Sequence, residues 1–164
     1  MPAFMHPYTD DTPETFFGGW ALPWSLDEMQ LDMRESVSEL TRIRKTYLAD
    51  IAAEFFTGRI DLGTKRKDIA WFSLNGNEMT EDRWEDGARR TLTVFIDAGP
   101  DQGLLLLLNS ERSEAEITLP GEQWGSSYRR IFGAASSVLT HMPVIQVPGS
   151  KVKVPPHCAQ VWLS

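Results

Sequence analysis

The stretch DIAWFSLNGNEMTEDRW, residues 68–84, decides the fold of this chain. It contains Trp71 and Trp84, two of the six tryptophans, and the only Asn-Gly pair, Asn75-Gly76. A single long helical pattern precedes it, and short strands and turns follow it. The stretch is therefore the point at which the chain changes from helical to β-type periodicity.

Each part of this stretch has a local structural interpretation. The aromatic and β-branched run Asp68–Ser73 predicts a strand. Asn75-Gly76 accepts the positive φ angles of a type I′ hairpin turn. Thr80 is placed to cap a short helical turn that ends in Trp84. We expect a compact unit of strand, tight turn and helical turn.

Residues 25–52 predict one long amphipathic helix, preceded by an irregular lead-in over residues 1–24. Ser25 and Glu28 have the spacing of a capping box at the start of the helix. Apolar residues recur at spacings of three and four: Leu26, Met29, Met33, Val37, Leu40, Ile43, Tyr47 and Ile51. This stripe needs a partner surface. A sheet of the same chain, a second copy of the chain and a separate domain all remain candidates.

Residues 53–164 read as a series of short strands. A first short strand is expected at Glu54–Thr57, and Leu104–Leu108 lacks polar alternation, which predicts burial on both faces. Further strands are expected at 91–96, 115–119, 128–132, 144–147, 152–154 and 158–163. Short strands about ten residues apart are typical of an antiparallel sandwich. The expected fold class is mainly β with one long N-terminal helix.

Composition excludes several classes of function. The net charge of −7 argues against a nucleic-acid partner, which needs a basic face. No apolar run is long enough to span a membrane, and the N-terminus lacks signal-peptide features, so we expect a cytoplasmic protein without a membrane partner. Cys158 is the single cysteine and reads as a small core residue.

The usual catalytic and metal-binding patterns are absent, so the sequence predicts no catalytic residue, no metal and no cofactor. The three histidines have no metal-ligand spacing, and there is no P-loop, GxGxxG or GxSxG. Asp68, Glu78 and Asp82 are candidates for paired acid–base carboxylates, but capping or solvated roles are favoured. The basic run Lys65–Lys67 admits a phosphate site, although a solvated loop is favoured.

Tryptophan rings stack on the apolar faces of sugars, which gives the chain a second class of candidate site. Trp71, Trp84 and Trp124 are the carbohydrate-binding candidates, and their alternative is a role in the core. Trp162, between Val161 and Leu163, reads as core or interface.

The order of residues in the opening stretch resembles the bacterial glycogen debranching enzymes, which are isoamylase-type members of the α-amylase superfamily. Asp68–Phe72, a turn ending in Gly76, Glu78–Thr80 and then Trp84 carry the resemblance. It extends to four further segments and covers about residues 25–164. These segments are Leu40–Lys45, Phe55–Arg59, Leu104–Asn109 and Val154–Leu163.

The resemblance implies the C-terminal β-sandwich domain of that superfamily. The family's catalytic carboxylates lie on a (β/α)8 barrel, which needs about 250 residues. Only 24 residues precede the predicted helix, and none of the family's catalytic motifs is present, so no catalytic residue carries over.

Three functions follow as expectations. The first is a non-catalytic accessory domain that braces a barrel supplied elsewhere, with the helix stripe as the contact surface for that domain or for a second copy of the chain. The alternative is a standalone module that binds an α-glucan such as glycogen through exposed tryptophans. Debranching by this chain itself is the least favoured.

Overall fold

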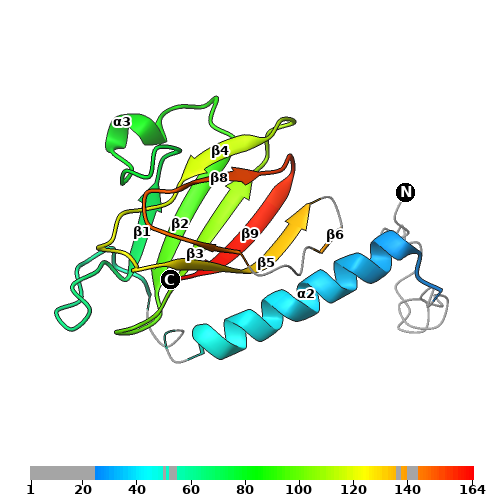
Figure 1. The fold of residues 1–164 in the computed structure, drawn as a ribbon, viewed down its shortest axis with the longest axis horizontal. Helices are drawn as coiled ribbons and strands as arrows, with labels where there is room; N and C mark the ends of the chain where they lie inside the picture. The colour runs from blue at the N-terminus through cyan, green and yellow to red at the C-terminus, as the bar shows by residue number, and fades with distance from the viewer. Residues whose placement is uncertain (1–24, 50, 52–54, 136–137, 140–143) are drawn as a thin grey trace, which may run out of the picture.

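The computed structural model describes residues 25–49, 51, 55–135, 138–139 and 144–164. The predicted lead-in, residues 1–24, lies outside them. Helix α2 (Glu28–Tyr47) precedes a β-rich region that includes one short helix, α3 (Glu81–Trp84). The strands are β1 (Ile69–Phe72), β2 (Thr91–Asp97), β3 (Gly103–Asn109), β4 (Ala115–Thr118), β5 (Tyr128–Ala135), β6 (Val138–Leu139), β7 (Ile145–Gln146), β8 (Lys151–Val154) and β9 (Cys158–Leu163). Figure 1 shows this mainly β architecture with one long helix, which confirms the expected fold class.

The larger sheet is antiparallel throughout, in the order β1-β2-β3-β9-β5-β6, with β7 also paired to β5. Because side chains alternate along a strand, each cross-strand row belongs to one face of the sheet. Ala70, Phe95, Leu105 and Trp162 form one row of the inner face. The next row along the strands, which includes Trp71 and Val94, belongs to the outer face.

A two-stranded sheet, β4-β8, covers the inner face of the larger sheet. Together the two sheets enclose the main core: Phe72, Phe95, Leu105, Leu107, Ile117, Leu119, Trp124, Tyr128, Val152, Val154 and Trp162 are among its members. Both sheets supply apolar side chains to one cluster, so the arrangement is a β-sandwich with sheets of unequal size. Leu104, Leu105 and Leu107 are buried as expected, whereas Leu106 is only partly buried and Leu108 is exposed, so burial on both faces does not extend along the whole leucine run.

Helix α2 lies on the outer face, and its buried residues are Ser36, near its middle, and Ile43, in its C-terminal half. Ile43 is 3% exposed and clusters with Leu104, Phe132 and Val161. In Figure 1 the N-terminal half of α2 runs past β5 and β6, beyond the edge of the sheet. Among the described residues, the first turns of α2 therefore have no strand of the sandwich beside them (Figure 1).

The helix is shorter than the predicted range 25–52, and its cap differs from the predicted one. Asp27, not Ser25, is the N-cap: its carboxylate accepts the Gln30 amide at 2.8 Å, and Gln30 Oε1 accepts the Asp27 amide at 3.1 Å. The capping box is thus shifted by two residues. A carboxylate is well suited to this position because it also faces the positive end of the helix dipole.

The hairpin after β1 differs from the predicted type I′ turn. Gly76 adopts a positive φ of 77°, but Asn75 does not. The Gly76 amide donates to the Ser73 carbonyl, and the Asn75 side chain accepts the Asn77 amide, so a longer loop forms in place of a two-residue turn. A Cβ on Gly76 would lie 3.0 Å from the Thr118 carbonyl oxygen, so this loop packs closely on β4.

Two other local predictions need correction. Thr80 precedes α3, but its hydroxyl donates to the Asp82 carboxylate at 2.5 Å and does not cap the helix backbone. No strand forms at residues 55–57, and Glu54 lies outside the described residues. Residues 57 and 58 are held by Asp68, whose carboxylate accepts both of their backbone amides, at 2.6 and 2.8 Å.

Arg66 is a buried clamp, and the interpretation of residues 65–67 as a solvated loop was wrong for it. Its guanidinium donates to Asp97 at 2.6 Å and to the carbonyls of Gly99 and Gln102 at 2.5 and 3.0 Å. It also lies over the Phe95 ring, 5.4 Å from the centroid. The clamp fixes the loop before β1 to the turn between β2 and β3.

Candidate functional site

The three tryptophans proposed for sugar binding occupy two different places. Trp124 is 6% exposed, with ring centroids 5.0 Å from Phe72 and 5.1 Å from Phe95. Trp124 belongs to the main core, and because its ring is enclosed there, it offers no face to a ligand. Trp71 and Trp84 lie together instead, 5.5 Å apart with an interplanar angle of 75°.

Trp84 borders a groove of about 630 Å³ on the outer face, at the end of the sheet where β2 begins and β3 ends. The side chain of Trp84 is half exposed, and Trp71 supports its edge from β1. Leu92, Leu108 and Ala159 form one cross-strand row beneath the groove. The remaining lining residues are polar or charged for the most part: Asp86, Arg89, Arg90, Thr91, Asn109, Ser110, His157 and Cys158.

Two consecutive arginines give the groove its charge. Arg90 Nη1 donates to the carbonyl oxygens of Gly87 and Arg89, at 2.9 and 3.0 Å. Arg89 Nη2 forms an ion pair with the Asp86 carboxylate at 3.8 Å, which is too long for a hydrogen bond, and its buried Nε has no hydrogen-bond partner among the described residues. The sequence interpretation missed this pair. The signal available to it was two adjacent arginines shortly after Trp84.

Cys158 and His157 meet the groove at the start of β9. Burial raises the pKa of the Cys158 thiol, and this outweighs the opposing effects of Gln160 and Arg130. A thiol with a raised pKa stays protonated near neutral pH and is a poor nucleophile. Cys158 is therefore a buried core residue, as its sequence context predicted.

The carboxylates considered for acid–base chemistry each have a separate structural partner. Asp68 accepts backbone amides from Thr57, Gly58 and Ile69. Glu78 pairs with Lys67, and Asp82 accepts the Thr80 hydroxyl. These contacts assign the three carboxylates to the ends and turns of the β1 hairpin.

Two further searches cover the described part of the chain. Among those residues, no group of three His, Cys, Asp or Glu side chains is arranged to hold a metal ion. None of the described helices has the length and apolar character needed to cross a lipid bilayer.

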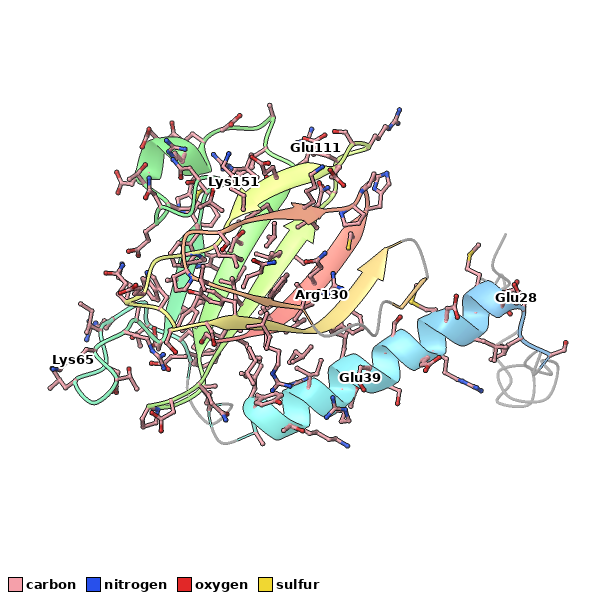
Figure 2. All side chains as sticks on the ribbon, viewed as in Figure 1. Glu28, Glu39, Lys65, Glu111, Arg130 and Lys151 are labelled. Atoms are coloured by element: carbon pink, nitrogen blue, oxygen red, sulfur yellow. The ribbon has the colours of Figure 1, made fainter. Side chains whose placement is uncertain are left out.

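The second candidate site is the uncovered face of α2, formed by Met29, Met33, Val37 and Leu40. Met29 is 66% exposed and Val37 is 55% exposed, although both belong to the predicted apolar stripe. In Figure 2, Glu28 marks the end of α2 that projects past the sheet, and Glu39 marks the part that runs beside it. Phe55 and Leu62, in the connection from α2 to β1, are also almost fully exposed.

Comparisons with known proteins agree with the sequence resemblance. Residues 68–161 match the family model described as "Isoamylase, C-terminal". "Glycogen operon protein GlgX homolog" from Mycobacterium bovis and from Mycobacterium tuberculosis is 28% identical to this chain over 120 residues. The match covers 63% of this chain and 17% of each relative. The chain thus spans about a sixth of the length of these relatives.

Two solved structures were also matched. A GH30 endoxylanase from Clostridium papyrosolvens gives a TM-score of 0.36 at 10% identity, covering 46% of this chain and 20% of that one. A family 44 endoglucanase from Clostridium thermocellum gives 0.34 at 12% identity, covering 45% and 16%.

Proposed function

The chain belongs to the isoamylase C-terminal family, and we propose that it is the non-catalytic accessory domain of a glycogen-debranching glycoside hydrolase. Its role is to brace the catalytic barrel of that enzyme. The family match and the relatives named for the glycogen operon support this proposal. The observation that carries it is the uncovered apolar face of α2, because an isolated domain gains nothing from exposing Met29, Met33, Val37 and Leu40 on one face.

The position of this face suits a docking role. The C-terminal half of α2 is anchored to the sheet through Ile43, so the helix is held in place while its N-terminal half projects. In the connection from α2 to β1, Asp68 holds residues 57 and 58, which are close in sequence to the exposed Phe55. A projecting helix and an exposed aromatic residue give a partner domain two apolar contacts of the kind found in permanent interfaces.

The test is a binding measurement with a related catalytic region. The Mycobacterium tuberculosis GlgX homolog, shortened by the part that matches this chain, is mixed with the 164-residue chain and followed by sedimentation velocity. We expect the wild-type chain to form a complex with this catalytic region and to self-associate when it is alone. The double variant Met33→Lys/Val37→Lys should do neither. Arg34→Gln, on the same helix, is the control and should behave as wild type. A monomer at high concentration that binds no barrel would contradict the proposal.

The proposal also includes a cytoplasmic location and no catalysis by the isolated chain. Incubation with a branched glucan should release no reducing ends, with a complete debranching enzyme as the positive control. Release that follows the purified chain through two chromatographic steps would restore the least favoured function, debranching by this chain itself.

A second candidate function is α-glucan binding at the groove beside Trp84. The half-exposed Trp84 ring and its support by Trp71 favour it. Affinity electrophoresis in a gel containing glycogen tests it. We expect retardation of the wild-type chain and its loss in Trp84→Ala, and equal mobility with and without glycogen would remove this function.

A further inference from the structure

We propose that the groove beside Trp84 binds a hexose carrying a phosphate monoester, with Arg89 and Arg90 facing the phosphate and Trp84 facing the sugar. The inference rests on the second candidate function, α-glucan binding, and narrows its ligand. It goes beyond a neutral sugar platform because the groove combines an aromatic ring with two guanidinium groups.

The two guanidinium groups are available for an anion. Arg90 Nη1 donates only to main-chain carbonyls, at 2.9 and 3.0 Å. Arg89 forms an ion pair with Asp86, with 3.8 Å between Nη2 and the carboxylate, and this distance is too long for a hydrogen bond. Within the described ranges, neither arginine has a hydrogen bond to a carboxylate. Guanidinium groups bind phosphate oxygens in a forked geometry, so an added phosphate would accept hydrogen bonds from the Nη atoms of the two arginines.

The charge of the groove is opposite in sign to that of the whole chain. Its lining has two arginines against one carboxylate, Asp86, in a chain with a net charge of −7. A phosphate monoester carries about −1.5 to −2 charges at neutral pH and suits a compact pair of cations. Nucleic acid requires an extended basic face, which this acidic chain does not offer.

Other residues of the lining suit a sugar ring. Trp84 is 51% exposed, and Trp71 holds its orientation through an edge contact. Leu92, Leu108 and Ala159 provide an apolar floor, and the Ser110 hydroxyl lies at the rim, where it donates to the Arg90 carbonyl at 2.8 Å. A volume of about 630 Å³ lies within the range of small-ligand sites.

The test is titration of the 164-residue chain by calorimetry at low salt with glucose 1-phosphate, glucose, inorganic phosphate and neutral maltoheptaose. We expect glucose 1-phosphate to bind at least about tenfold more tightly than glucose or inorganic phosphate, as charge-assisted hydrogen bonds require. Arg90→Gln should weaken the binding of glucose 1-phosphate by about tenfold. Arg34→Gln removes the same charge from α2 and should have no effect.

The sugar phosphate could belong to a phosphorylated glucan or to a free hexose phosphate. Titration with a maltotetraose that carries one 6-phosphate distinguishes these two ligands. Tighter binding than glucose 1-phosphate identifies a phosphorylated glucan, and weaker binding identifies a free hexose phosphate; both support the inference. In each variant, the melting temperature verifies folding. In the wild-type chain, the Trp84 indole N–H resonance should shift on addition of glucose 1-phosphate.

Several outcomes would overturn the inference. The inference fails if glucose 1-phosphate binds no more tightly than glucose or than inorganic phosphate. It also fails if the Trp84 resonance does not shift on addition of glucose 1-phosphate. Maltoheptaose binding without a preference for phosphate would overturn the inference and leave α-glucan binding intact. Absence of binding by every saccharide would remove both.

Discussion

The two faces of the larger sheet are covered to different extents. The inner face is closed by β4 and β8, and its side chains, among them Phe95, Leu105 and Trp162, are almost completely buried. On the outer face, Ile43 of α2 packs against residues of β3, β5 and β9, and the Trp84 groove and the first turns of the helix stay exposed. The same strands supply both faces. The inner face therefore accounts for the stability of this domain, and the outer face is where it can meet other molecules.

The largest expected effect comes from the centre of the inner face. Trp162→Ala should lower the free energy of unfolding by about 4 kcal/mol, because it removes a large buried side chain and leaves a cavity. Urea denaturation measures the change. Trp84→Ala, on the outer face, is the matched control and should cost less than about 1 kcal/mol. Similar losses for both variants would remove the distinction between the faces.

The next effect concerns the clamp at the edge of the inner face. Asp97→Ala should cost about 3 kcal/mol, because it leaves the Arg66 guanidinium buried without its carboxylate. Thermal unfolding measures it. Glu116→Ala removes one partner of the exposed pair with Lys151 and should cause no resolvable change. An unchanged melting temperature in Asp97→Ala would show that the neighbouring carbonyls alone satisfy Arg66.

The outer face should show a smaller effect that depends on position along α2. Ile43→Ala should cost about 2 kcal/mol, since Ile43 packs against Phe132 and Val161. Val37→Ala, on the same helix, should change stability by less than about 0.5 kcal/mol because Val37 is exposed. Urea denaturation followed by the helical circular dichroism signal measures the stability of both variants. A large effect of Val37→Ala would mean that another part of the chain covers the N-terminal half of α2.

A fourth prediction concerns the connection between the helix and the sheet. Burial alone would raise the pKa of Asp68, but hydrogen bonds from Thr57, Ile69 and Gly58 outweigh it and lower the pKa. The stabilisation is therefore complete above the unfolded-state pKa, about 4, and is lost as the pH falls through the lower folded-state pKa. Asp68→Asn should cost about 1 kcal/mol at pH 7, allowing for its partial exposure. Stability curves of the two proteins should converge at low pH, and a constant difference down to pH 2 would contradict this assignment.

The smallest effect is expected for Tyr128, which lies in the main core. The Tyr128 hydroxyl is buried and has no hydrogen-bond partner among the described residues, and burial raises the pKa of this phenol, an effect that Arg66 only partly opposes. Tyr128→Phe removes a group that is desolvated without compensation, so the free energy of unfolding should stay within about 0.5 kcal/mol or increase. A loss above about 1 kcal/mol in urea denaturation would reveal a hydrogen bond to this hydroxyl.

Local patterns in the sequence predicted the elements better than their ends. The alternation and length of the apolar runs placed β2, β3, β8 and β9 correctly, because a strand is defined by a period of two residues. The capping box was displaced from Ser25 to Asp27, because several polar residues near a helix start compete for the same amides. The Asn75-Gly76 pair formed a longer loop because contacts with β4 also act on it.

The candidate site depended on contacts that no local pattern contains. Trp71, Trp84 and Trp124 are equivalent by composition, yet Trp124 is buried between Phe72 and Phe95. Arg66 belongs to a basic run that resembles a solvated loop, and its partner Asp97 is 31 residues away. The groove arginines, Arg89 and Arg90, acquire a common environment only when β3 and β9 pair beside β2.

The sequence by itself determined the fold class, the long amphipathic helix and the family, because these depend on periodicity and on the order of residues along the chain. Residues 68–84 carried most of that information. Only the tertiary structure decided which part of the apolar stripe is buried, which tryptophan reaches the surface and which arginines line the groove. The reason is that burial and charge pairing depend on the neighbours of a side chain in space, and strand pairing brings these neighbours from distant parts of the chain.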